Sequence, residues 1–195
     1  MSVRTEDLTP RHWPAIERLF GARGACGGCW CMHWRARSGE HWDANKGAVN
    51  RRRFRRLVST GRAGGVLAFR GEEPVGWLAC GPRTDFTRLQ RARTLACDDA
   101  DRVWSLPCFF VKSGHRGQGV ATALLSQALR SLRKRGVAIV EGYPANPRAR
   151  LPAAFAFTGT TALFARAGFQ AVGNIGGGRQ RMRRTLLVRA SRPDR

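Results

Sequence analysis

The chain has 195 residues, of which 43% are hydrophobic and 25% are charged. This composition fits one globular domain and excludes fibrous and disordered proteins. No run approaches the roughly 18 apolar residues of a membrane span, and the N-terminal sequence lacks the apolar core of a secretory signal. We therefore expect a cytoplasmic protein with no membrane partner.

The net charge is strongly positive, because 35 Lys and Arg residues against 13 Asp and Glu residues give +22. Such a surface is typical of proteins that bind nucleic acid or other polyanions. A GC-rich genome would enrich arginine without any such partner, and both interpretations stay open. Residues 102–195 contain no carboxylates other than Glu141 and Asp194, so we expect an anion to bind in this half.

The first half of the chain predicts an extended segment at 3–8 and then a helix with Thr9 as its N-cap. Residues 21–44 form a loop rich in Gly, Cys and Trp. Asn45 is expected to cap a basic helix over 46–59.

Two apolar runs, 66–69 and 75–79, flank a turn-like Gly-Glu-Glu-Pro sequence and predict a β-hairpin. Residues 81–101 are predicted to be an irregular polar connection. The next strand covers 103–111, with Pro107 expected at a bulge or an edge because proline has no N–H to donate to a ladder.

A glycine-rich turn at 112–119 precedes a helix that runs from Val120 to Gly136 with its apolar residues on one face. The apolar run 137–140 is typical of a buried parallel strand. A proline-rich loop at 143–158 follows.

The C-terminal part predicts a short helix over 160–167 and two last strands, 169–172 and 182–188, joined by three glycines. The expected fold class is a mixed α/β single domain.

Residues 109–122 form the strongest local motif, a strand that enters a glycine turn and opens a helix. Glycines let successive backbone N–H groups point outward, and the helix N-terminus adds partial positive charge. Together they suit a pyrophosphate. The alternative is an ordinary turn that merely needs glycines.

The turn resembles the acetyl-CoA signature of the GNAT superfamily of N-acetyltransferases, Arg/Gln-x-x-Gly-x-Gly/Ala, at Arg116, Gly119 and Ala121. Residues 164–169 resemble a second element of that family, aromatic-x-x-x-Gly-Phe. The two motifs stand in the family's order, with a strand and a helix between them.

The resemblance implies one GNAT-like domain over 1–190, with a mixed, mostly antiparallel central sheet, helices on both faces, and splayed central strands that form the CoA cleft. Residues 1–100 would supply the acceptor-side helices and the hairpin, and 101–189 the acetyl-CoA-binding part. Residues 190–195 are expected to be a flexible tail.

The resemblance also implies acetyl-CoA as co-substrate. Backbone amides of 116–122 and the Thr122 hydroxyl would hold its pyrophosphate, and the backbone of 109–111 would pair with its pantetheine arm. The predicted cofactor-binding residues are Phe109, Phe110, Val111, Arg116, Gly117, Gln118, Gly119, Val120, Ala121 and Thr122.

Many family members donate a proton to the leaving thiolate from a tyrosine where this chain has Phe164, which cannot donate. Glu141 and Tyr143 are the predicted catalytic residues instead. Glu141 would accept the proton of the amine, and Tyr143, the only tyrosine, would face the same side of its strand and donate to the thiolate. The alternative for Glu141 is an ion pair with an arginine.

The loop between the first two helices holds Cys26, Cys29, Cys31 and His33, which are zinc-type ligands. A second well-spaced pair is missing, so no metal is expected, although this spacing leaves zinc binding open. Without a secretory signal most of the cysteines are expected to be thiols.

In the family this loop commonly lines the acceptor side of the cleft. Trp30, Trp34 and Trp42 are therefore the predicted substrate-binding residues, as an aromatic wall for a cationic or planar acceptor. Packing in a satellite core beneath the loop is the alternative. The proline-rich segment 144–152 would form the opposite lip.

The expected function is acetyl transfer from acetyl-CoA to a primary amine of a small molecule, such as a metabolite, amino compound or antibiotic, by direct attack in a ternary complex. One alternative is a nucleic-acid-binding protein on a GNAT-like scaffold, because the basic run 51–56 would suit phosphates. Another is an acetyltransferase acting on an RNA-linked amine such as aminoacyl-tRNA. Nucleic acid is not the favoured partner, and we expect a monomer or homodimer.

Overall fold

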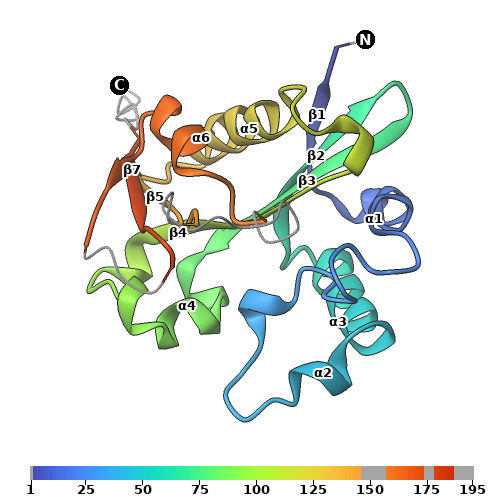
Figure 1. Ribbon diagram of the computed structural model, residues 1–195, viewed down its shortest axis with the longest axis horizontal. Helices are drawn as coiled ribbons and strands as arrows, with labels where there is room; N and C mark the ends of the chain where they lie inside the picture. The colour runs from blue at the N-terminus through green and yellow to red at the C-terminus, as the bar shows by residue number, and fades with distance from the viewer. Residues whose placement is uncertain (1, 146–156, 174–177, 187–195) are drawn as a thin grey trace, which may run out of the picture.

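The computed structural model describes residues 2–145, 157–173 and 178–186. These residues form a seven-stranded sheet in the order β1-β2-β3-β4-β5-β7-β6 (Figure 1). The strands are β1 (Arg4–Asp7), β2 (Gly64–Arg70), β3 (Glu73–Pro82), β4 (Val103–Val111), β5 (Ile139–Gly142), β6 (Gln170–Ala171) and β7 (Met182–Thr185). Every neighbouring pair is antiparallel except β4 and β5, which are parallel.

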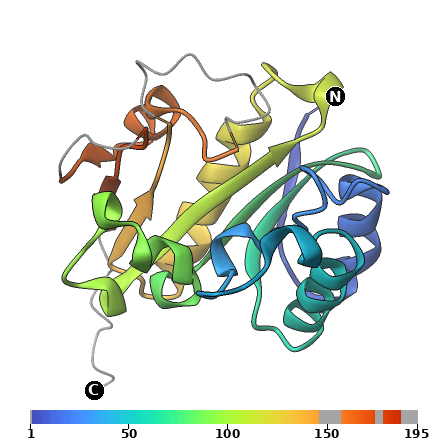
Figure 2. The same ribbon diagram turned by 60° about the horizontal axis from the view of Figure 1, so that its bottom comes forward.

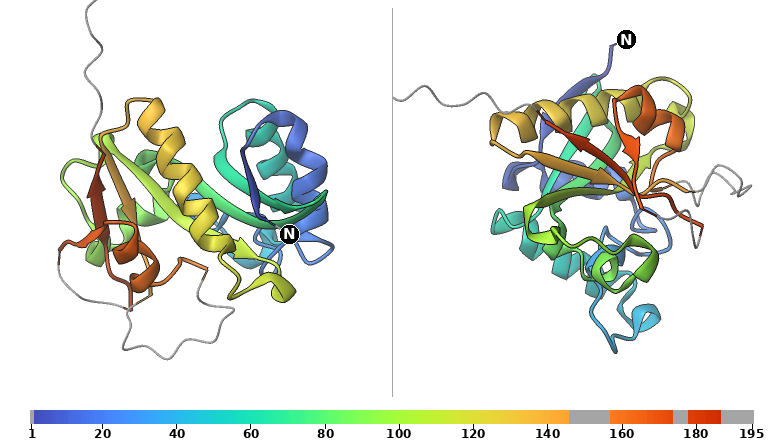
Figure 3. Two further views of the ribbon diagram at one scale, coloured as in Figure 1. Left: turned by 90° about the horizontal axis from the view of Figure 1, so that it is seen from above. Right: turned by 90° about the vertical axis from the view of Figure 1, so that its left-hand side faces the viewer.

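Helices cover both faces of the sheet (Figure 3). The helices are α1 (Trp13–Phe20), α2 (Trp42–Asn45), α3 (Ala48–Ser59), α4 (Thr87–Arg91), α5 (Val120–Lys134) and α6 (Thr161–Arg166). Helices α5 and α6 pack on one face, and α1 and α3 pack on the other. The mixed, mostly antiparallel sheet predicted from the sequence is therefore confirmed.

Side-chain alternation along β2 explains why this strand is apolar throughout. Val66 and Ala68 belong to the core under α5, whereas Leu67 and Phe69 belong to the core under α1 and α3. Successive strand residues point to opposite faces, and here both faces are covered. A continuous apolar run is the result.

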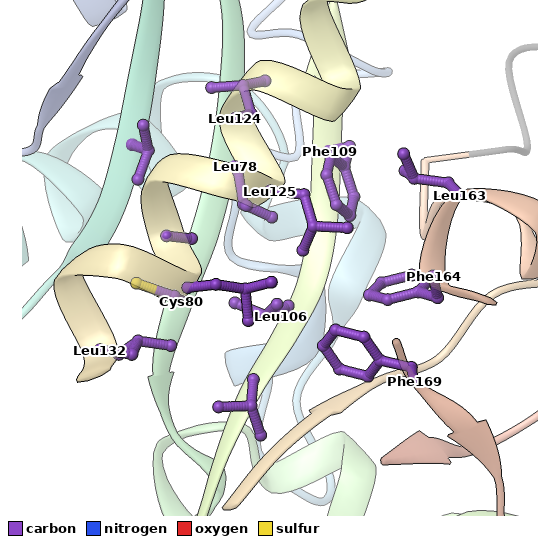
Figure 4. Close-up of a cluster of buried hydrophobic side chains, with 14 of the residues drawn as sticks. Leu78, Cys80, Leu106, Phe109, Leu124, Leu125, Leu132, Leu163, Phe164 and Phe169 are labelled. Atoms are coloured by element: carbon purple, nitrogen blue, oxygen red, sulfur yellow. The ribbon is translucent and has the colours of Figure 1, made fainter. Parts of the chain in front are cut away.

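The core under α5 contains the whole helical face that the sequence predicted, and Leu125 joins it (Figure 4). The predicted residues are Val120, Leu124, Ala128, Leu129 and Leu132. Leu124 and Leu125 of α5 pack with Leu106 of β4, and Phe164 and Phe169 close the cluster from the C-terminal part. Each of these side chains is at most 3% exposed. Docking of α5 in turn fixes the position of the glycine turn that precedes it.

Pro107 lies where the pairing of β4 changes. The register with β3 shifts between Ala79 and Gly81, which face Cys108 and Ser105, so β4 carries an additional residue there. The parallel pairing with β5 ends at Leu106. Proline at an interrupted ladder fits its missing donor, and beyond it β4 and β5 diverge (Figure 2).

Two expectations about the first half are wrong in detail. Asn45 does not cap the basic helix, since Gly47 precedes α3 and the Asn45 side chain donates to Glu40 Oε1 at 2.8 Å. The connection 81–101 is not merely polar, because it forms short helices that bury a third apolar cluster, consisting of Trp34, Phe86, Leu89, Leu95 and Tyr143.

The expected tail at 190–195, nearly all of the proline-rich lip and most of the triple-glycine link lie outside the described residues. Within the ranges that the structure describes, no helix is both long enough and apolar enough to cross a bilayer.

Candidate active site

The glycine turn joins β4 to α5 through a short 3₁₀ turn, Ser113–His115. Gly117 and Gly119 have φ angles of +70° and +79°, a region that favours glycine. A Cβ atom at either position would meet nothing within 4 Å. The space over the turn is therefore open to a ligand.

A cavity of about 580 Å³ lies over this turn and along the end of β4, and we call it the turn cavity. It brings together all the predicted cofactor-binding residues except Gln118, namely Phe109, Phe110, Val111, Arg116, Gly117, Gly119, Val120, Ala121 and Thr122. Gln118 instead donates to the Gly114 carbonyl at 2.9 Å. The opposite wall comes from Phe157 and the start of α6, where Thr160 caps the helix.

One backbone donor of β4 already has a partner. The Phe109 N–H donates to the carbonyl of Phe157 at 2.5 Å, on the side where the pantetheine arm was expected to pair. The Arg116 Nε donates to the Val111 carbonyl at 3.2 Å. A ligand that pairs with this strand edge therefore competes with contacts made by the chain itself.

A second cavity of about 300 Å³, the aromatic cavity, adjoins the first. The two share Ala25, Cys26, Phe109, Phe110 and Phe157 as lining residues. The remaining lining residues are Phe20, Gly27, Cys29, Cys31, His33, Trp34, Trp42, Lys46, Trp77 and Cys108. Among the residues that the structure describes, no carboxylate lines this cavity.

The predicted aromatic wall is assembled only in part. Trp34 and Trp42 line the aromatic cavity, whereas Trp30 does not. Trp30 is 5% exposed and stacks on Trp13 with ring centroids 5.9 Å apart. Its position agrees with the alternative of a core tryptophan.

His33 is a lining residue that the sequence indicated only as a zinc-type ligand. Its ring makes edge contacts with Trp34 and Trp42, with ring centroids 5.1 and 5.3 Å away. Burial, together with the charges of Arg88 and Arg179, lowers its pKa to about 4. The imidazole is therefore neutral at physiological pH.

Glu141 and Tyr143 are brought together, but away from both cavities. Each side chain is 0% exposed, and neither lines the turn cavity or the aromatic cavity. The Tyr143 hydroxyl donates to Glu141 Oε2 at 3.1 Å and lies 2.6 Å from Ser105 Oγ. Burial, reinforced by the Glu141 charge, raises the pKa of Tyr143.

Two arginines complete this buried network. Arg83, 1% exposed, donates from Nη1 to Glu141 Oε2 at 3.1 Å and to Tyr143 Oη at 2.6 Å. Arg183 donates from Nε to Glu141 Oε1 at 2.9 Å and from Nη2 to Asp99 at 2.7 Å. The ion pair that the sequence left as the alternative for Glu141 is present, and its predicted catalytic role stays a prediction.

Arg83 and Arg183 were missed by reasoning from the sequence. Nothing in the local pattern distinguishes them from the other basic residues. Only the pairing of β5 with β7 and the burial of segment 81–101 bring both to Glu141.

Phe164 occupies the position where the family commonly has tyrosine. It is 0% exposed and packs edge-on against Phe109 and Phe169, with ring centroids 5.9 and 5.0 Å apart (Figure 4). Its ring also lies where a Cβ atom on Gly142 would be. The phenylalanine therefore serves as a core residue and does not line the turn cavity.

The cysteine loop does not gather its zinc-type ligands. Cys26 is exposed, Cys31 accepts a hydrogen bond from Trp77 Nε1 at 3.2 Å, and Arg88 donates to His33 Nδ1 at 3.2 Å. In the part of the chain that the structure describes, no three His, Cys, Asp or Glu side chains are placed to hold a metal ion.

Comparison with known proteins agrees with this geometry. The model of the acetyltransferase (GNAT) family matches residues 31–157. The match covers more than half of the sequence, so the chain belongs to the GNAT acetyltransferase family and is an acyltransferase. A search of curated proteins found no match.

Solved structures share the fold. PaiA N-acetyltransferase of Thermoplasma acidophilum, in complex with coenzyme A, is 13% identical with a TM-score of 0.56, and the alignment covers 95% of this chain and 100% of that one. YncA, a putative acetyltransferase of Salmonella typhimurium with acetyl-CoA, is 15% identical with a TM-score of 0.57 over 100% and 99%. The ribosomal-protein-alanine N-acetyltransferase of Brucella melitensis is 18% identical with a TM-score of 0.56 over 95% and 100%.

Proposed function

We propose that the protein transfers an acetyl group from acetyl-CoA to a primary amine of a small molecule, by direct attack in a ternary complex. The observation that carries this proposal is the meeting of the two cavities at Phe109, Phe110 and Phe157. One cavity opens over the glycine turn and the other ends among aromatic side chains. A donor and an acceptor bound in them would meet at the end of β4.

The turn cavity suits the pyrophosphate end of acetyl-CoA. The open space over Gly117 and Gly119 leaves the amides before α5 accessible, and the N-terminus of that helix favours negative charge. The Thr122 hydroxyl, which lines the same cavity, would donate to a phosphate oxygen. Coenzyme A in the PaiA structure and acetyl-CoA in the YncA structure support this assignment.

Transfer requires a neutral amine. Its nitrogen bonds to the thioester carbon, the C–S bond breaks, the thiolate takes up a proton and the nitrogen loses one. The cations around the aromatic cavity would lower the pKa of a bound ammonium group, because like charges disfavour the charged form. The site would thus favour the nucleophilic form of the acceptor.

Glu141 and Tyr143 fit a positioning role in this scheme. They lie in β5 and just beyond its end, and Tyr143 packs behind Trp34 with ring centroids 6.5 Å apart. Their buried network would hold β5 and the aromatic wall in place. Direct proton transfer by this pair is the alternative role, and the pH profile of kcat in Glu141→Gln separates it from positioning.

The test of the proposed function is calorimetric titration with acetyl-CoA at moderate salt. We expect stoichiometric binding by the wild type, and Gly117→Glu and Gly119→Glu to weaken it at least roughly 100-fold, because each places a carboxylate over the pyrophosphate site. Gly136→Glu is the matched control, since Gly136 also has a positive φ angle, +73°, and open space around it, but lies after α5. Unchanged binding in both turn variants would refute the assignment.

The net charge of +22 supports the alternative of a nucleic-acid-binding protein. Arg52, Arg55 and Arg56 are exposed on α3, and a basic helix face binds phosphates by releasing counterions. Salt-dependent RNA binding by a protein that neither binds acetyl-CoA nor acetylates amines would favour this alternative. Binding and acetylation of aminoacyl-tRNA would favour the RNA-linked acceptor.

A further inference from the structure

Two half-buried arginines contact aromatic side chains that line the aromatic cavity, although neither arginine is itself a lining residue. The Arg179 guanidinium lies over the rings of Trp34 and Phe157, 5.3 and 5.0 Å from their centroids. The Arg88 guanidinium lies 5.0 Å from the centroid of Trp42. Both arginines therefore make cation–π contacts with aromatic side chains that line the aromatic cavity.

Neither arginine has a carboxylate partner among the described residues. Arg179 donates to Thr158 Oγ1 at 2.5 Å and Arg88 donates to His33 Nδ1 at 3.2 Å, and the ion pairs within 2–145, 157–173 and 178–186 include neither of them. Asp194 is the one side-chain carboxylate of the sequence outside these ranges. Burial lowers the pKa of both guanidinium groups, and the charge of Glu40 partly offsets this effect at Arg88.

Other arginines that leave solvent differ in how they are paired. Arg83 and Arg183 are both paired with Glu141, whereas the half-buried Arg70 and Arg184 form no ion pair within the described residues and do not lie at this cavity. A desolvated cation without a counter-ion is costly in a protein and is retained where a ligand supplies the opposite charge.

Lys46 also lines the aromatic cavity, although it is paired with Asp43 at 2.5 Å, and no carboxylate lines the cavity among the residues that the structure describes. The guanidinium of Arg179 beside this apolar wall therefore leaves the site with unbalanced positive charge.

We propose that the acceptor is an amine that also carries a compact oxyanion, such as a carboxylate, and an apolar body. This inference rests on the proposed function. The oxyanion pairs with Arg179, the apolar body packs against Trp34 and Trp42, and the amine is directed toward the shared wall at Phe109 and Phe110. Polyamines, aminoglycosides and lysine-rich peptides carry further cations that this positive charge repels.

The test uses matched sets of amines at saturating acetyl-CoA, with thiol release as the readout. Each set contains an apolar amino acid (leucine, methionine, phenylalanine or tryptophan), its primary amide, its decarboxylated amine and its aminophosphonate analogue. Spermidine serves as the polycationic probe. We expect wild-type kcat/KM for at least one carboxylate or phosphonate to exceed that of its amide and amine roughly 30-fold, since one charged hydrogen-bonded pair distinguishes them.

Variants assign the preference to Arg179. Arg179→Gln should lower kcat/KM for the anionic acceptor roughly 10- to 100-fold, mainly through KM, and change the value for the neutral amide by no more than about threefold. Arg179→Lys keeps the charge without the planar fork and should lie between the two. Arg135→Gln is the control, because Arg135 also lies over a tryptophan, Trp104 at 6.0 Å, but this tryptophan lines neither the turn cavity nor the aromatic cavity.

The outcomes separate this inference from the proposed function. Loss of acetyl-CoA binding by folded wild-type protein would refute the proposed function itself. Intact acetyl-CoA binding with equal or faster turnover of amides, decarboxylated amines or spermidine, or with no turnover of any anionic amine, would refute only the acceptor class. The carboxylate and phosphonate members identify which oxyanion the site prefers.

Discussion

The turn cavity and the aromatic cavity adjoin, yet they are built in different ways. Much of the turn cavity comes from one continuous stretch, 109–122, and its proposed ligand contacts are largely backbone amides. The aromatic cavity collects side chains from segments as distant as Phe20 and Phe157. The backbone geometry of a glycine turn can be predicted from the local sequence. The side chains that line the aromatic cavity depend instead on how distant segments pack.

Substitution of the tryptophans should give the largest difference between a core position and a cavity-lining position. Trp30→Ala should destabilise the protein by about 3–5 kcal/mol, because it removes a buried ring from the core. Trp42→Ala, at a half-buried lining position, should cost about 1 kcal/mol but raise the acceptor KM about tenfold.

Urea unfolding and steady-state kinetics with the best amine of the panel measure the two effects. Acetyl-CoA affinity should stay unchanged in Trp42→Ala, which serves as the internal control for the neighbouring cavity. A large rise in acceptor KM for Trp30→Ala without loss of stability would instead show that Trp30 contacts the acceptor, as the sequence predicts.

Arg83 tests whether the buried network supports the aromatic wall and not the turn. Arg83→Met removes the cation that pairs with Glu141 and donates to Tyr143 and to the Leu95 carbonyl. Breaking a buried pair from one side typically costs about 3–5 kcal/mol, and acetyl-CoA affinity should change by less than about threefold because the turn is distant from the network. Arg135→Met, at an exposed position, is the matched control for stability, and an equal loss in both variants would contradict a special role for Arg83.

The sequence predicts most of the fold because its signals are local. The short helix predicted over 160–167, the apolar face of α5 and the interruption of β4 at Pro107 each follow from a few neighbouring residues. Asn45 failed as a cap because α2 ends with it and Gly47 precedes α3.

The acceptor side was less predictable for a physical reason. That Trp34 and Trp42 line a cavity and Trp30 does not depends on the left-handed backbone at Trp30 and Cys31, with φ angles of +42° and +59°. Such conformations are uncommon for residues other than glycine. The placement of Arg179 depends likewise on contacts with Thr158 and Trp34, which are remote in sequence.

Variants of Glu141 and Tyr143 test whether these residues act in catalysis or in positioning, and their expected loss of stability is intermediate. Glu141→Gln should destabilise the fold by about 1–3 kcal/mol, because it weakens the charged hydrogen bonds from Arg83 and Arg183. Tyr143→Phe should cost about 1 kcal/mol. As positioning residues they should change acceptor KM more than kcat.

The pH profile of kcat provides the readout that a positioning role does not move. If Glu141 accepts the amine proton, Glu141→Gln should change the acidic limb of that profile, to which the acceptor ammonium also contributes, and Ser105→Ala, in the same network through its contact with Tyr143, should leave the limb intact. An unchanged limb in Glu141→Gln, with a raised KM, supports positioning.

His33 should give the smallest effect on stability. Its protonation reports on the burial and the positive charges around the aromatic cavity. Its pKa lies at about 4 in the folded protein against an ordinary 6.5. Between these values the unfolded chain binds more protons than the folded one, so the free energy of unfolding contributed by His33 falls as pH falls from about 6.5 to 4. Because the ring is partly exposed, we expect about 1 kcal/mol over this window.

The measurement is the difference in urea unfolding between wild type and His33→Gln at pH 4, 5, 6 and 7. Burial also lowers the pKa of His12, but His12 and the acidic residues contribute equally to both proteins and cancel in the difference. Arg179→Gln should shrink the pH dependence, because it removes one of the two cations that oppose protonation of His33. A difference that stays flat with pH would mean that His33 is neither desolvated nor under the influence of the arginines, and the positive field on which the anionic acceptor depends would then be absent.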